Sequence, residues 1–164
     1  MRGKDQQLQI RVTAAEKATI QHAAARAHLD MSQWVLAKLL PRGAERFHEL
    51  TQTLGREPES DRYTLAEIND LLTSLGNSAF SSAVAARPAP LSDEYLANYV
   101  AAMVETAAHL RRIPPPEWTA SVAPLARPAF GTALMSLRLH LLLSAPPAFR
   151  RRNIFVDASI GDRV

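Results

Sequence analysis

The sequence predicts a mainly α-helical protein that begins with one short β-strand. Residues 7–13, QLQIRVT, alternate between polar and apolar side chains with the period of a half-buried strand. Helical spacing follows at once, with neither a second strand nor a hairpin turn. Because the backbone groups of a strand must be hydrogen-bonded, this lone strand needs a partner from elsewhere.

Two helices are expected directly after the strand. Thr13 and Glu16 form a T-A-A-E capping box that starts the first helix, whose apolar face is mostly alanine. Asp30 and Gln33 have the same spacing in D-M-S-Q and start the second. That helix ends before Pro41, because a proline ring disfavours helix in the residue preceding it. The order is therefore strand, helix, turn, helix.

The rest of the chain is predicted to be helical, with polar and proline-rich breaks. A helix is expected after Gly43, followed by a polar linker with the sequence GREPESDR, residues 55–62. Thr64 and Glu67 are expected to cap the next helix. Three further helices are expected over residues 77–86, over residues 93–112 with Ser92 as the cap, and over residues 132–145. The last, TALMSLRLHLLLSA, is so apolar that we expect it at the centre of the core.

Composition and charge narrow the class of protein. Among 164 residues, 47% are hydrophobic, 6% are aromatic and none is cysteine, which excludes disulfides and thiolate metal sites. The polar start and the absence of a long apolar segment predict a soluble cytoplasmic protein without membrane contact. The first 50 residues carry eight Lys and Arg against five Asp and Glu, and residues 149–164 carry four against two. This basic excess at both ends suits binding to a polyanion.

The lone strand indicates a dimer. A segment of about 40 residues is too small to bury a core alone. If two chains meet, each strand pairs antiparallel with its copy and four helices cover the apolar face. The predicted dimer core consists of Leu8, Ile10, Val12, Trp34 and Val35.

Residues 7–40 resemble the ribbon-helix-helix family, the Arc and MetJ class of DNA-binding dimers. The resemblance is carried by QLQIRVTAAEK, QHAAARAHL and DMSQWVLAKLL. It implies an intertwined homodimer whose two-stranded ribbon enters the major groove of a double-stranded DNA operator. It also implies that Gln7, Gln9 and Arg11 read base edges, for which Gln suits adenine and Arg suits guanine.

Phosphate contacts are expected beside this reading surface. Backbone N–H groups at Met31 and Ser32, where the second helix starts, are placed to hold a phosphate, and family members use this helix start as a clamp. Asp30 departs from that pattern, because a carboxylate next to a phosphate is electrostatically unfavourable. Arg2 and Lys4 are expected to add contacts that position the protein without specifying sequence, and a solvated chain start is the alternative.

The long remainder of the chain predicts a second function. We expect a ribbon-helix-helix module over residues 1–43, a helix and linker over 44–62, and an all-α partner-binding domain over 63–164. The whole chain resembles antitoxins of this kind, which implies a transcriptional repressor that also neutralises a cognate toxin protein. The alternative, built on the same DNA module, is an accessory DNA-binding protein of plasmid partition or of the relaxosome.

A run of three arginines lies near the end of the chain. Arg150, Arg151 and Arg152 are interpreted as a cationic rim around a buried Phe149, Ile154 and Phe155 cluster. One alternative is that they bind nucleic acid, and another is that they bind an acidic protein partner, which suits an antitoxin.

No motif predicts catalysis, and no metal or cofactor is expected. The five histidines lack the H-E-x-x-H spacing, and there is neither a phosphate-binding glycine loop nor a G-x-S-x-G elbow. Arg42 and His48 in RGAERFH resemble the R-x(4–6)-H pattern of HEPN ribonucleases. We treat that as a remote alternative, because Arg42 is expected at a helix break. The protein is expected not to be an enzyme.

Overall fold

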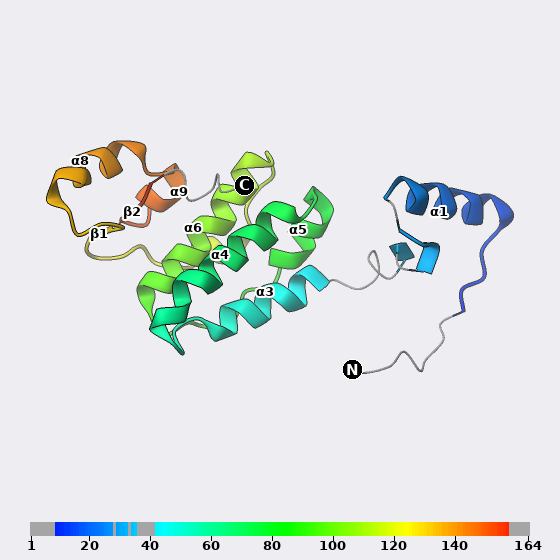
Figure 1. Ribbon diagram of the computed structural model, residues 1–164, viewed down its shortest axis with the longest axis horizontal. Helices are drawn as coiled ribbons and strands as arrows, with labels where there is room; N and C mark the ends of the chain where they lie inside the picture. The colour runs from blue at the N-terminus through cyan, green and yellow to red at the C-terminus, as the bar shows by residue number, and fades with distance from the viewer. Residues whose placement is uncertain (1–8, 28, 33, 36–41, 158–164) are drawn as a thin grey trace. The chain divides into compact units, whose positions relative to one another are not determined.

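A computed structural model describes residues 9–27, 29–32, 34, 35 and 42–157 (Figure 1). The chain divides into two compact units, Met1–Leu40 and Pro41–Val164. The described residues are mainly helical, which confirms the predicted fold class. None of the described helices combines the length and the apolar character needed to cross a bilayer.

The first unit contains α1, Ala14–Arg26, and the predicted capping box at its start is confirmed. The Glu16 N–H donates to Thr13 Oγ1 at 3.3 Å, and the Thr13 N–H donates to Glu16 Oε2 at 2.8 Å. Two N–H groups that would otherwise lack partners at the helix start are thereby satisfied.

The segment Gln9–Thr13 is neither helix nor strand in the single chain, and its side chains are exposed. A strand that pairs only with a second copy has no partner in one chain, so the antiparallel ribbon stays a prediction. Helical conformation resumes at Met31, and the Trp34 N–H donates to the carbonyl of Asp30 at 2.9 Å, where the second helix is expected. Gln33 lies outside the described residues, so the second capping box also stays a prediction.

The second unit is built around α6, Glu94–Leu110, a 17-residue helix with ten buried residues. Asp93 caps it, one residue later than expected, and its Oδ1 accepts from the Tyr95 and Leu96 N–H groups at 2.7 and 3.3 Å. Helices α3, Arg42–Thr53, α4, Pro58–Ser74, and α5, Asn77–Val84, pack with α6 into one hydrophobic core. The core is centred on Phe47, Ile68, Leu72, Phe80, Val100 and Val104.

The polar stretch expected as a linker is partly helix. Helix α4 begins at Pro58, which occupies its first turn, where the missing N–H is not needed and the fixed φ angle favours helix. Glu59 and Asp61 add the negative charge that a helix N-terminus favours. The predicted cap at Thr64 is therefore wrong, because Thr64 lies inside α4 and its hydroxyl donates to the Ser60 carbonyl at 3.3 Å.

The chain closes with short elements: α7, Glu117–Ala120, β1, Ala129–Phe130, α8, Met135–Ser144, α9, Pro147–Arg150, and β2, Ile154–Phe155. The two strands pair in parallel, with Ala129 opposite Ile154 and Phe130 opposite Phe155. The C-terminal domain, predicted to be all-α, therefore includes one minimal sheet. Its strands have only two residues each, which is too short for alternation in the sequence to reveal them.

The expectation that residues 132–145 form the centre of the core is wrong. They do contain a helix, α8, but Leu141 is its only buried residue. The core position belongs to α6, whose alanines allow neighbouring helices to approach on several sides. Apolar content alone therefore did not identify the central helix.

Arg111 joins the end of α6 to the end of α4. Its guanidinium donates to the carbonyls of Thr73 and Leu75 at 3.1 and 3.0 Å, and also to that of Leu72. It lies over the Phe80 ring, 4.7 Å from the centroid. Since α4 has no basic residue in its own last turn, Arg111 supplies both the donors and the positive charge that a helix C-terminus favours.

Replacing Arg111 with Met should lower the free energy of unfolding by about 1–3 kcal/mol, because the carbonyls at the end of α4 lose their donors. Urea denaturation of the full chain measures this. Arg112→Met is the matched control, since Arg112 is exposed. Its φ of 57° is as unfavourable for Met as it is for Arg, so the substitution adds no backbone strain. Equal stability of the two variants would contradict the capping role.

Candidate functional site

The residues predicted to read DNA lie on the exposed segment that precedes α1. Gln9 and Arg11 are both exposed, and the capping box fixes the chain direction immediately after them. Gln7, the third predicted reading residue, lies outside the described residues. Of the residues predicted to read DNA, the two that the structure describes are therefore accessible to solvent.

The predicted dimer-core residues are only partly covered in the single chain. Ile10 and Val12 are exposed, and Trp34 and Val35 are half-buried. Leu8 lies outside the described residues. In α1 the one buried residue is Ala24. The exposure of Ile10 and Val12 is what a module completed by a second chain would require, and the dimer core stays a prediction.

The predicted phosphate clamp is described in part. Met31 and Ser32 are exposed at the start of a helical segment, where the first N–H groups of a helix lack internal partners. Arg2 and Lys4 lie outside the described residues. The base-reading and phosphate roles stay predictions.

Glu16 is an acidic group of this unit with a shifted pKa. The backbone N–H of Thr13, and then the Thr13 hydroxyl, lower the pKa of Glu16 below 4.5 by donating to its carboxylate. The carboxylate is thus held at the start of α1, where the helix dipole also favours negative charge.

Comparison with known proteins supports the ribbon-helix-helix character of the N-terminal part. Residues 2–79 match the family model described as NikA-like, mobilization protein NikA. The match covers the first unit and continues through α3 and α4 into α5. No curated protein and no solved structure matches the chain. The description of the family names a mobilization protein and no antitoxin.

The three consecutive arginines have three different environments. Arg150 is exposed, and Arg151 is an exposed side chain whose guanidinium lies 3.3 Å from Glu105 Oε2. Arg152 is buried, so its expected place in a cationic rim is wrong, and so is the alternative that it lies on a partner-binding surface. The local sequence does not reveal that Arg152 is buried, because the carboxylate with which it pairs is distant in the sequence.

Arg152 ties α6 to the C-terminal segment. Its Nη2 donates to Glu105 Oε1 at 2.5 Å and to the Thr119 carbonyl at 2.7 Å. Its Nη1 donates to Asn98 Oδ1 at 3.2 Å and to the Val122 carbonyl at 3.0 Å. Sequence reasoning missed Glu105, although a lone carboxylate within the apolar run YVAAMVETAA is a signal for a buried partner.

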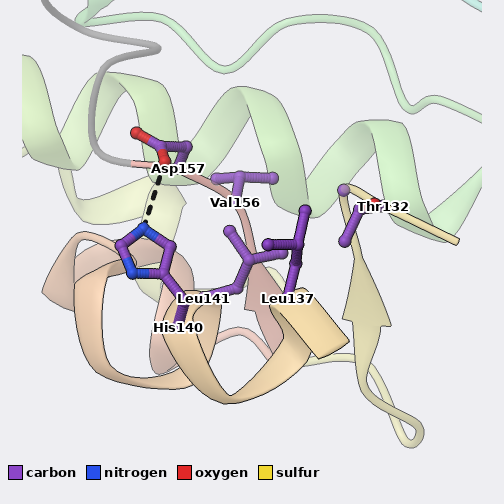
Figure 2. A pocket seen from close by; sticks show the side chains of 7 residues that line it. Thr132, Leu137, His140, Leu141, Val156 and Asp157 are labelled. Atoms are coloured by element: carbon purple, nitrogen blue, oxygen red, sulfur yellow. Dashed lines mark ion pairs between the residues drawn. The ribbon is translucent and has the colours of Figure 1, made fainter. Parts of the chain in front are cut away.

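A shallow pocket of about 390 Å³ lies between α8 and the segment after β2 (Figure 2). It is lined mainly by apolar groups from Leu137, Leu141 and Val156, with His140 Nε2 3.5 Å from Asp157 Oδ2 at its edge. The side chains of His140 and Asp157 are both largely exposed. Among the described residues there is no group of His, Asp and Glu able to hold a metal ion.

The remote ribonuclease alternative gains no support from the geometry. Arg42 is the first residue of α3, and His48 follows six residues later on the same helix. His48 instead lies edge-on to Phe47, 6.0 Å between ring centroids.

Thr13→Val should raise the pKa of Glu16 toward 4.5, because one of the two donors to its carboxylate is removed. In the wild type, the folded pKa is the lower one. The stabilisation of α1 is therefore complete above the unfolded pKa and is lost as pH falls through the folded value.

NMR titration of the Glu16 carboxyl carbon and of the α1 amides checks this. Glu16→Gln serves as the control that abolishes the titration while retaining most of the side-chain shape. An unchanged Glu16 pKa in Thr13→Val would contradict the account.

Arg152→Met should lower the free energy of unfolding by about 3–5 kcal/mol, because Glu105 is left buried without its main partner. Arg150→Met is the matched control, expected within about 0.5 kcal/mol of the wild type. Arg151→Met, which removes an exposed ion pair, should cost at most about 1 kcal/mol. Chemical denaturation of the three variants measures the loss in the free energy of unfolding at each position. A similar loss at all three positions would show that the run acts through its total charge.

Proposed function

We propose that the protein is a homodimeric, sequence-specific DNA-binding protein that serves as an accessory factor in DNA mobilization, as a component of a relaxosome. The observation that carries the proposal is the match of residues 2–79 to the NikA-like family, since NikA is a ribbon-helix-helix relaxosome protein.

The residues of the first unit support the DNA-binding part of this proposal. Exposed Gln9 and Arg11 precede a capped helix, and a helix start at Met31 offers backbone N–H groups to a phosphate. A two-stranded ribbon fits the major groove, in which Gln and Arg distinguish adenine and guanine. The basic excess of the first 50 residues adds long-range attraction to DNA.

The antitoxin role predicted from the sequence stays a prediction. A repressor and a mobilization factor share the DNA module and differ in the DNA they prefer and in their partner. The family match favours mobilization because its description names that process. No observation on the described residues favours a toxin partner.

Arg11→Ala should weaken binding to the preferred duplex by about 1–3 kcal/mol and leave binding to a scrambled duplex unchanged, because a base contact is lost. Fluorescence anisotropy of the full chain, with duplexes tiled across the transfer origin and across the promoter of its own gene, measures both. Mobilization predicts that the preferred duplex comes from the transfer origin.

Arg87→Ala is the matched control, since Arg87 is an exposed arginine of the second unit and is expected to leave both affinities unchanged. Equal weakening by Arg11→Ala on preferred and scrambled DNA, with a smaller salt slope, would assign Arg11 to phosphate instead. Preference for the promoter alone would favour the repressor role over mobilization.

A further inference from the structure

Helix α8 has an apolar face that stays exposed among the residues that the structure describes. Met135, Leu139 and Leu143 are 71, 67 and 75% exposed, and Leu142 is 40% exposed. Their spacing places them on one side of the helix, in a stripe about 100° wide. Leu141, the buried residue, lies on the opposite side, against β2 and the pocket of Figure 2.

The apolar side of a helix is normally buried. In α8 Leu141 packs inward, whereas Leu137, which lines the pocket, is itself 44% exposed. The stripe has the composition of a core and the exposure of a surface. Contiguous exposed apolar patches of this kind mark interaction sites in soluble proteins.

The stripe itself carries no charge. The two charged side chains of α8 lie beside it and have partners within the unit. Arg138 lies over the Phe130 ring, 4.8 Å from its centroid, and His140 pairs with Asp157. A copy of α8 brought against this stripe meets only Leu and Met, so no unpaired charge is buried.

The area is also of the right order for a paired helix. The four side chains expose on the order of 500 Å² per chain, so two copies would bury about 1,000 Å², the lower bound for a specific interface. Such a contact is weak by itself. Within a dimer already held by the N-terminal module, the second contact is intramolecular and a small interface suffices.

We propose that α8 pairs with α8 of a second copy of this chain, through the stripe of Met135, Leu139, Leu142 and Leu143, as a second contact within the dimer. This rests on the dimeric N-terminal module of the proposed function. The pairing is isologous, since the same stripe is used on both chains.

Single cysteines test this directly in the full chain, which contains no cysteine of its own. Met135→Cys, Leu139→Cys and Leu143→Cys place a thiol along the stripe. Tyr63→Cys is the matched control, because Tyr63 is 61% exposed on α4 and away from α8 in the sequence. Gln9→Cys reports the N-terminal ribbon. Each variant is treated at low concentration with a short bismaleimide and analysed on a denaturing gel.

We expect at least one stripe variant to link two chains several-fold more efficiently than Tyr63→Cys, with the product stopping at two chains. Links at Gln9→Cys without links along the stripe would overturn the α8 pairing and leave the N-terminal dimer intact. Absence of links at all positions would overturn both. Links along the stripe alone would support the pairing and contradict the N-terminal dimer, and a ladder of higher species would overturn pairing within one dimer.

Discussion

The constraint on the first unit is that the segment before α1 needs partners for its apolar side chains and for its backbone N–H and C=O groups. Ile10 and Val12 are exposed beside a helix whose only buried residue is Ala24. A unit this small buries too little apolar surface to offset the conformational entropy lost on folding. The predicted strand must also find hydrogen-bond partners for its backbone. In the proposed dimer a second chain supplies both, and the resulting ribbon is also the surface proposed to read DNA. Folding, dimerisation and recognition are thus one event in this account.

The second unit is constrained differently, because it has a core of its own. Helix α6 is buried along most of its length and packs against α4, α7 and α9, while α3 packs on α4 and α5 and contributes to the same core. Two arginines hold outer elements in place by hydrogen bonds. Arg111 donates to the carbonyls at the end of α4, and Arg152 donates from the C-terminal segment to Glu105. The family match runs through α4 and ends within α5, so the resemblance to mobilization proteins includes part of this unit as well as the DNA-binding segment.

Local chemistry was predictable from the sequence, and long-range packing was not. The capping box at Thr13 depends on residues three apart, and the pattern was sufficient. The polar sequence around Pro58 predicts a linker, although proline in a first turn favours helix. The leucine content of α8 predicts a place in the core, but burial depends on which elements pack against the helix. Arg152 and Glu105 are 47 residues apart in the sequence, so nothing local distinguishes the buried arginine from Arg150. The reading residues, in contrast, followed from alternation and the family resemblance, and their role awaits experiment.

The most direct test of the central claim is hydrogen exchange at the backbone amides of residues 9–12 as a function of protein concentration. These amides are in neither helix nor strand in the single chain, so protection requires a second copy. The account predicts slow exchange of alternate amides at concentrations that favour the dimer, and rapid exchange after dilution. Rapid exchange at every concentration, or protection that does not change on dilution, would contradict it.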